Sequence, residues 1–151
     1  MAEWKSIDDI LDFAIGEEEK AQAFYEEMAG KSESSAMKEV FSGFALEEKG
    51  HRAKLIAVKE GKIEEPFAGK VADLKIGDYL VEMEATPETS YQEALIIAMK
   101  KEKAAFKMYS DMASSVKDEN LENLFLGLAQ EEAKHKLRFE VEYDDNILTE
   151  N

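Results

Sequence analysis

The sequence predicts an all-α protein: an antiparallel four-helix bundle made of two repeated helical hairpins joined by a long crossover. Three observations support this prediction. Apolar residues recur at alternating spacings of four and three in four separate segments of the 151-residue chain. The second half repeats the first at a constant offset of 84 residues. The stretch between the halves is punctuated by glycine and proline and keeps no helical period.

The composition predicts one globular domain over residues 1–151, because apolar residues make up 44% of the chain, enough to form a core. The net charge of −15 argues against nucleic acids and anionic membrane surfaces as partners. The absence of cysteine excludes disulfides, iron–sulfur clusters and thiolate metal sites. We expect a cytoplasmic protein without a membrane partner, since the N-terminus resembles no secretory signal and no apolar run approaches the roughly 20 residues that span a bilayer.

The first predicted helix begins at Ser6, because Asp9 three residues later gives the spacing of a capping box. It ends near Gly30, a residue type suited to a C-cap. Its inward stripe is Ile7, Leu11, Ala14, Glu18, Ala21, Tyr25 and Met28. Glu18 is therefore a carboxylate at a position where a hydrophobic residue is expected.

The second predicted helix follows a polar turn at residues 31–34 and ends before Gly61. Its inward stripe is Met37, Phe41, Phe44, Glu48, His51, Leu55 and Val58. Two polar residues again interrupt an apolar seam. Glu47 lies on a different line of the helix, so Glu48 is the better inward candidate.

The repeats are predicted at about residues 6–60 and 90–144, with the crossover at about 61–89. Ser90 and Asp118 are the predicted caps of the third and fourth helices. The third stripe is Tyr91, Leu95, Ala98, Glu102, Ala105, Tyr109 and Met112, and the fourth is Leu121, Phe125, Leu128, Glu132, His135 and Phe139. The acidic tail from residue 144 onward is expected to fray.

Without a gap, 14 of the 46 aligned positions from Ser6–His51 and Ser90–His135 are identical. Both histidines of the chain fall in repeated motifs, Glu48-Lys-Gly-His51 and Glu132-Ala-Lys-His135. Residues three apart on a helix share a face, so each motif presents a carboxylate and an imidazole together. The repeat also selects Glu18 from the run at residues 17–19, because its neighbours align with lysines.

Six polar groups thus lie on predicted inward stripes: Glu18, Glu48, His51, Glu102, Glu132 and His135. Burying four carboxylates without compensation is costly. Two divalent cations would neutralise them, and the two imidazoles would complete the coordination. One glutamate from each of two helices and Glu-x-x-His from each of the other two is a known dimetal constellation. Oxygen and nitrogen ligands suit iron or manganese and tolerate zinc. The alternative is a metal-free bundle whose acidic seams are solvated.

Tyr25 and Tyr109 each lie two helical turns after a candidate ligand, on the same face. Two interpretations stay open. They are core aromatic residues whose hydroxyls need partners, or they form hydrogen bonds to the ligating carboxylates.

The segment Ala14-Ile-Gly-Glu-Glu18 with Tyr25, the Glu48-Lys-Gly-His51 motif and their repeats resemble the rubrerythrin branch of the ferritin-like family over nearly the whole chain. The resemblance implies a ferritin-like bundle that binds two irons through Glu18, Glu48, His51, Glu102, Glu132 and His135. It also implies reduction of hydrogen peroxide with electrons that arrive through a rubredoxin domain.

The chain departs from that family at two points. It has no cysteine, so an external donor such as a rubredoxin is expected. Ala105 stands where rubrerythrins carry an extra glutamate, which makes the predicted site more symmetric. We expect a di-iron oxidoreductase acting on hydrogen peroxide or dioxygen, as a peroxidase or ferroxidase. Non-catalytic iron scavenging or storage is the alternative, and the sequence leaves a homodimer open.

Overall fold

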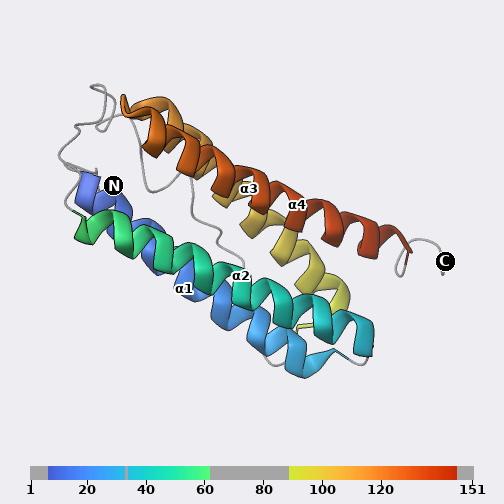
Figure 1. The fold of residues 1–151 in the computed structure, drawn as a ribbon. Coiled ribbons are helices and arrows are strands. Elements are labelled where there is room, and N and C mark those ends of the chain that lie inside the picture. Colours follow the sequence, from blue (N-terminus) through green and yellow to red (C-terminus); the bar gives the residue numbers. More distant parts are fainter. Residues whose placement is uncertain (1–6, 33, 62–88, 146–151) are drawn as a thin grey trace. The chain divides into compact units, whose positions relative to one another are not determined.

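A computed structural model describes residues 7–32, 34–61 and 89–145 of the chain, and every described element is an α-helix. The helices are α1 (Ile7–Lys31), α2 (Ser35–Glu60), α3 (Tyr91–Ser115) and α4 (Glu119–Tyr143). Figure 1 shows α1 running beside α2 and α3 beside α4. The chain divides into two compact units, one built on α1 and α2 and the other on α3 and α4.

The internal repeat is visible in the helix boundaries. α1 and α3 begin at Ile7 and Tyr91 and end at Lys31 and Ser115, so both boundaries differ by the predicted offset of 84 residues. The helices of each hairpin are separated by three residues in both halves. The two loops therefore have equal lengths, as the ungapped repeat of the sequence predicts.

Side-chain caps fix where three helices begin. Ser34 accepts a hydrogen bond from the backbone N–H of Met37 at 3.2 Å, which caps α2. The predicted caps Ser90 and Asp118 are confirmed, since each side chain accepts a backbone N–H of the first turn, at 3.1 and 2.8 Å. Each cap satisfies a donor that the helix itself leaves without a partner. The predicted cap Ser6 and most of the predicted crossover lie outside the described residues.

The first helix ends at Lys31, one residue beyond Gly30 and therefore close to the predicted end. Lys31 forms an ion pair with Glu27 at 3.4 Å, and its positive charge at the last turn suits the helix dipole. The Ser32 backbone N–H then donates to the Met28 carbonyl at 3.0 Å, which closes the helix end. The predicted end of the second helix before Gly61 is confirmed.

The core of the first hairpin follows the predicted stripes but is wider than they are. Leu11, Ala14, Tyr25, Met28, Met37, Phe41 and Leu55 are buried, and Ile10, Phe24 and Ala45 are buried beside them. Phe44 and Val58 are only half-buried. A helix that packs in a globular protein buries a broader face than a strict coiled-coil seam, which explains the additional residues.

The second hairpin buries the corresponding residues and has a part-buried polar pair at its open end. Its core includes Leu95, Ala98, Tyr109, Met112, Leu121, Phe125, Leu128 and Phe139. The Tyr91 hydroxyl at the start of α3 donates to Glu142 Oε2 at the end of α4, at 3.0 Å. This hydrogen bond connects the two helices of the hairpin at their open end, opposite the loop.

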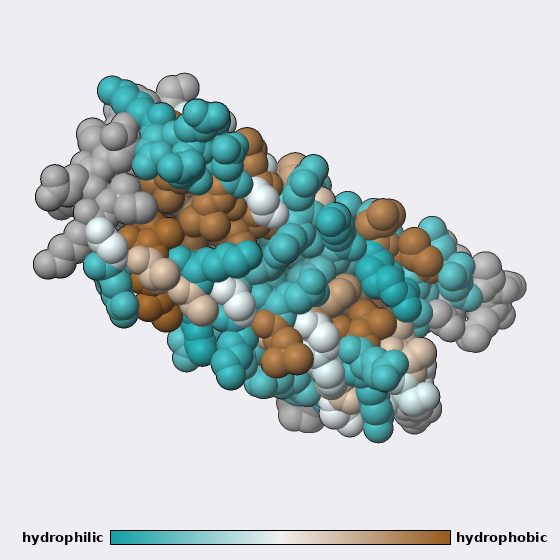
Figure 2. Space-filling view, viewed as in Figure 1, coloured by the Kyte–Doolittle hydropathy of each residue, from teal (hydrophilic) through white to brown (hydrophobic). Residues whose placement is uncertain are grey.

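The face in Figure 2 is mostly hydrophilic, with hydrophobic side chains in several patches. Among the described residues, the exposed large apolar side chains are Leu46, Ile56, Phe106, Leu126, Leu137 and Val141. None of the described helices is both long and apolar enough to span a membrane.

Candidate metal centre

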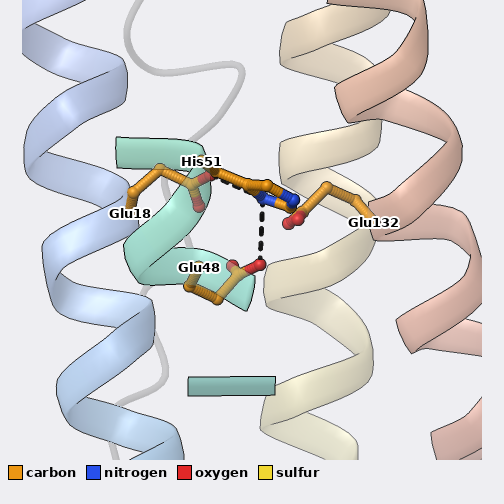
Figure 3. Close-up of side chains that lie close together, drawn as sticks. All are labelled: Glu18, Glu48, His51 and Glu132. Atoms are coloured by element: carbon orange, nitrogen blue, oxygen red, sulfur yellow. Dashed lines mark ion pairs between the residues drawn. The ribbon is translucent and has the colours of Figure 1, made fainter. Parts of the chain in front are cut away.

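The first hairpin brings three predicted ligands together in its interior. α1 supplies Glu18, and α2 supplies Glu48 and His51 (Figure 3). The Nδ1 atom of His51 lies 2.9 Å from Glu18 Oε2 and 3.2 Å from Glu48 Oε1. Each residue offers one ligand atom, and these atoms lie within 4.8 Å of one another. The three side chains form a compact set of donors, which we call the first triad.

The second hairpin contains the equivalent set, the second triad. α3 supplies Glu102, and α4 supplies Glu132 and His135. Their ligand atoms also lie within 4.8 Å of one another. The Nδ1 atom of His135 lies 3.6 Å from Glu102 Oε1. The helical periodicity therefore places the same three residue types in the interior of both hairpins.

Burial distinguishes the six predicted residues from their acidic neighbours. Glu48 is fully buried, with 0% of its surface exposed, whereas the adjacent Glu47 is exposed. In the run at residues 17–19, Glu18 is buried and Glu19 is exposed. The groups of described residues that could hold a metal contain the six predicted residues and no others.

The buried charges of the first triad shift its protonation. Burial raises the pKa of Glu18 to about 8, and the negative charge of Glu48 adds to this effect, against a hydrogen bond to His51. For His51, burial alone would lower the pKa, but hydrogen bonds to Glu18 and Glu48 outweigh it and raise the pKa to about 11. Without a cation, the triad therefore retains protons at neutral pH.

The donor set fits a divalent metal ion. Each triad offers two carboxylates and one imidazole, and carboxylate–imidazole sites suit iron, manganese and zinc. No lysine or arginine is buried among the described residues, so a bound cation is the natural counter-charge for these acids. A metal would replace the protons that the triads otherwise hold.

The two tyrosines near the triads are buried but have different surroundings. The Tyr25 ring stacks on Phe41 with a centroid distance of 6.3 Å. It also makes edge contacts with Phe44 at 6.0 Å and with Phe24 at 5.4 Å. Tyr109 is fully buried, in a hairpin where Met108 and Leu128 replace the aromatic Phe24 and Phe44. The core role of both rings is evident, and hydrogen bonding to the ligands stays a prediction.

The half-buried Tyr91 and the buried Glu142 form a polar contact that the sequence did not predict. Burial raises the pKa of Tyr91, and the nearby charge of Glu142 adds to the increase. The two residues lie at opposite ends of the hairpin sequence, so no local pattern marks them as partners.

Comparisons with known proteins agree with this geometry. The family model described as Rubrerythrin matches residues 9–143. A protein from Thermotoga maritima described as a ferritin-like diiron-carboxylate protein has a similar structure, with a TM-score of 0.78 and 19% identity over 97% of this chain and 99% of that one. A hypothetical protein from Pyrococcus furiosus has a TM-score of 0.71 and 27% identity over 89% of this chain and 86% of that one. No curated protein matches the sequence.

The structural similarities confirm the predicted all-α, ferritin-like four-helix class. The family match, together with the buried glutamate and histidine groups, indicates metal binding.

Proposed function

The chain belongs to the rubrerythrin family, and from this membership we propose that it is a di-iron carboxylate oxidoreductase that reduces hydrogen peroxide or dioxygen. The observation that carries the proposal is the pair of repeat-related, buried triads, each with two carboxylates and one imidazole. A structural bundle has no use for six buried titratable side chains at equivalent positions of both hairpins.

In this proposal, the two triads together hold two irons. Glu18, Glu48 and His51 supply one half of the ligands, and the second triad supplies the other. The four carboxylates carry −4 in total, which two divalent ions neutralise. Manganese or zinc would satisfy the same donors, but only a redox-active metal supports the proposed reaction.

A pair of ferrous ions would supply two electrons, which with two protons convert one molecule of hydrogen peroxide into two molecules of water. The residues of the chain have three tasks. Burial of the triads excludes bulk water. The carboxylates of Glu18 and Glu48 hold the His51 ring in one orientation through Nδ1. The raised pKa of Glu18 lets its carboxyl group hold a proton in the metal-free hairpin at neutral pH, and bound iron would displace that proton.

The electrons must come from outside these 151 residues. The chain contains no cysteine, so it carries no thiolate-bound iron centre of its own. A separate redox protein, such as a rubredoxin, is the expected donor.

Iron scavenging or storage without turnover is the second candidate function. Ala105 favours it, because a glutamate occupies this position in rubrerythrins and would add an acid next to Glu102. Without that acid, the two halves offer the same donors, a symmetry that iron binding alone would explain.

Metal analysis combined with peroxide kinetics tests both candidates. The purified chain is loaded with ferrous iron under anaerobic conditions, and bound iron per chain is measured. About two irons per chain are expected, and fewer than about one would contradict both candidates. The reduced, loaded protein is then mixed with peroxide. Consumption no faster than that by free ferrous iron would leave iron binding without the oxidoreductase activity.

A further inference from the structure

The outer side of α3 carries a basic surface with one exposed aromatic ring. We define the α3 lysine face as Lys100, Lys103 and Lys107 together with Phe106. All four side chains are exposed, and 43% of the Phe106 surface is accessible. The lysines are spaced by three and four residues, so they project from one side of the helix. Phe106 lies at the edge of this side, next to Lys103 and Lys107.

Residues 94–110 carry a net positive charge, whereas the whole chain is negatively charged. The whole chain contains 34 acidic residues and has a net charge of −15. Between residues 94 and 110, however, the one acid is Glu102, which is buried. Lys107 forms an exposed ion pair with Asp111 at 2.8 Å. Exposed pairs of this kind are weak, and the sequence of residues 94–110 carries an excess of positive charge.

The repeat provides an internal comparison for this surface. In α1, the positions equivalent to Lys100, Lys103 and Lys107 are occupied by Gly16, Glu19 and Ala23. The position equivalent to Phe106 is Gln22. The buried stripes of the two hairpins match, yet these outer positions all differ. The lysine face is therefore not a requirement of the hairpin fold.

The lysine face lies behind a proposed iron ligand. Glu102 projects from the buried side of α3, and the lysines project from its exposed side. An α-helix with its side chains is about 10 Å wide. A molecule bound to the face is thus separated from the ligand by a single helix, a short path for an electron.

We propose that the α3 lysine face is the docking surface for a small, net-acidic electron-transfer protein that reduces the metal centre. This inference rests on the proposed function, which requires electrons from another protein. Charge complementarity selects the occupant. An acidic donor is repelled by a chain of net charge −15 and attracted to its local basic surface, which orients the encounter. The exposed Phe106 ring supplies the apolar anchor of the contact, and the lysines form its charged surroundings.

The test measures electron transfer without peroxide. Reduced rubredoxin of acidic isoelectric point, used as the probe, is mixed with the oxidised, iron-loaded full chain, and its reoxidation is followed by stopped flow. For the wild type, we expect the rate to fall as salt rises, because attraction is screened. Replacing Lys100, Lys103 and Lys107 by glutamine should lower the rate about tenfold at low salt and flatten its salt dependence.

A matched control distinguishes the effect of the α3 lysine face from the effect of a general change in net charge. Replacement of Lys38, Lys49 and Lys54 by glutamine removes the same charge from exposed positions of α2. This control variant should keep the rate within about twofold of the wild type. Phe106→Ser should slow the reaction while preserving its salt dependence, since the substitution removes the apolar anchor but no charge.

Three kinetic results would contradict the proposed docking surface. The first is an equal loss of rate in the two triple-lysine variants. The others are a wild-type rate that rises with salt and a complete absence of electron transfer from rubredoxin to the wild type. Another is an oligomer that the α3 variant alone dissociates, because the face would then contact a second copy of the chain. Peroxide consumption after chemical reduction with dithionite tests the proposed function separately and should be unchanged in the α3 variant.

Discussion

His51 Nδ1 lies within 3.2 Å of carboxylate oxygens from both Glu18 and Glu48, yet Glu18 belongs to a different helix from the other two residues. The protonated contact of His51 with Glu18 therefore links α1 to α2. Loss of the proton, through metal binding or a rise in pH, affects the packing of both helices.

The stability of the metal-free protein should fall as pH rises from about 5 to about 9. The pKa of Glu18 rises on folding from 4.5 to about 8, and that of His51 from 6.5 to about 11. A raised pKa means that the folded state binds the proton more tightly. The Glu18 contribution is thus complete below pH 4.5 and is lost as pH rises through 8, and the His51 contribution is lost at still higher pH.

Thermal unfolding in the presence of a chelator measures this dependence. Glu18→Gln should reduce the decline between about pH 5 and 8, because the variant has no carboxyl group to titrate. The opposite trend is expected for metal: added ferrous iron should stabilise the protein more at higher pH, since the ligands must release protons to bind it. A metal-free wild type whose stability is constant or rises over this range would contradict the prediction.

Glu48→Gln should remove at least one of the two expected irons per chain, whereas Glu47→Gln should leave the iron content unchanged. The two glutamates are adjacent, but Glu48 is fully buried in the first triad and Glu47 is exposed. Each variant removes one negative charge from the chain. Iron analysis after anaerobic loading compares them, and similar losses in both would argue against Glu48 as a ligand.

Tyr25→Phe and Tyr109→Phe test the second interpretation of the tyrosines. Each substitution keeps the ring and removes only the hydroxyl, so the buried packing is preserved. If the hydroxyls support the ligating carboxylates, iron affinity or peroxide turnover should drop by about tenfold or more. Iron titration and stopped-flow kinetics provide the readouts. Unchanged values in both variants would leave the tyrosines as core residues.

Tyr91→Phe should destabilise the second hairpin by about 1–2 kcal/mol, because Glu142 then remains buried without the hydroxyl that donates to it. In a chain of this size, that corresponds to a decrease in Tm of about 2–8 °C. Tyr143→Phe is the control, since it removes an exposed 3.2 Å contact with Gln92 and should change Tm by less than about 2 °C. Equal shifts in the two variants would contradict the assignment.

Much of the fold could be predicted from sequence because two independent signals coincide. The stripes select the buried residues, and the constant offset identifies equivalent positions, so an ambiguous acid in one half is resolved by the other. Glu18 is the clearest case, because its neighbours align with Lys101 and Lys103. The buried positions of all six predicted ligands follow from these local rules.

Two features could not be predicted from sequence, because one depends on a long-range contact and the other on competing interactions of similar strength. The Tyr91–Glu142 contact joins residues that are distant in sequence, and no periodicity marks it. At Gly30, the preference of glycine for a C-cap competes with the Glu27–Lys31 ion pair and the favourable charge of Lys31 at the helix end. A difference of about 1 kcal/mol decides such a boundary, which is below what sequence rules discriminate.

The equal ligand sets of the two hairpins have an evolutionary consequence. Each hairpin encodes two carboxylates and one imidazole, so two copies of a single-hairpin ancestor would already have carried every donor of the proposed centre. Gene duplication and fusion would then have linked the donors in one polypeptide and relieved the two halves of the need to remain identical. Selection could keep the buried residues alike while the outer surfaces diverged, which gave one half a lysine face that the other lacks.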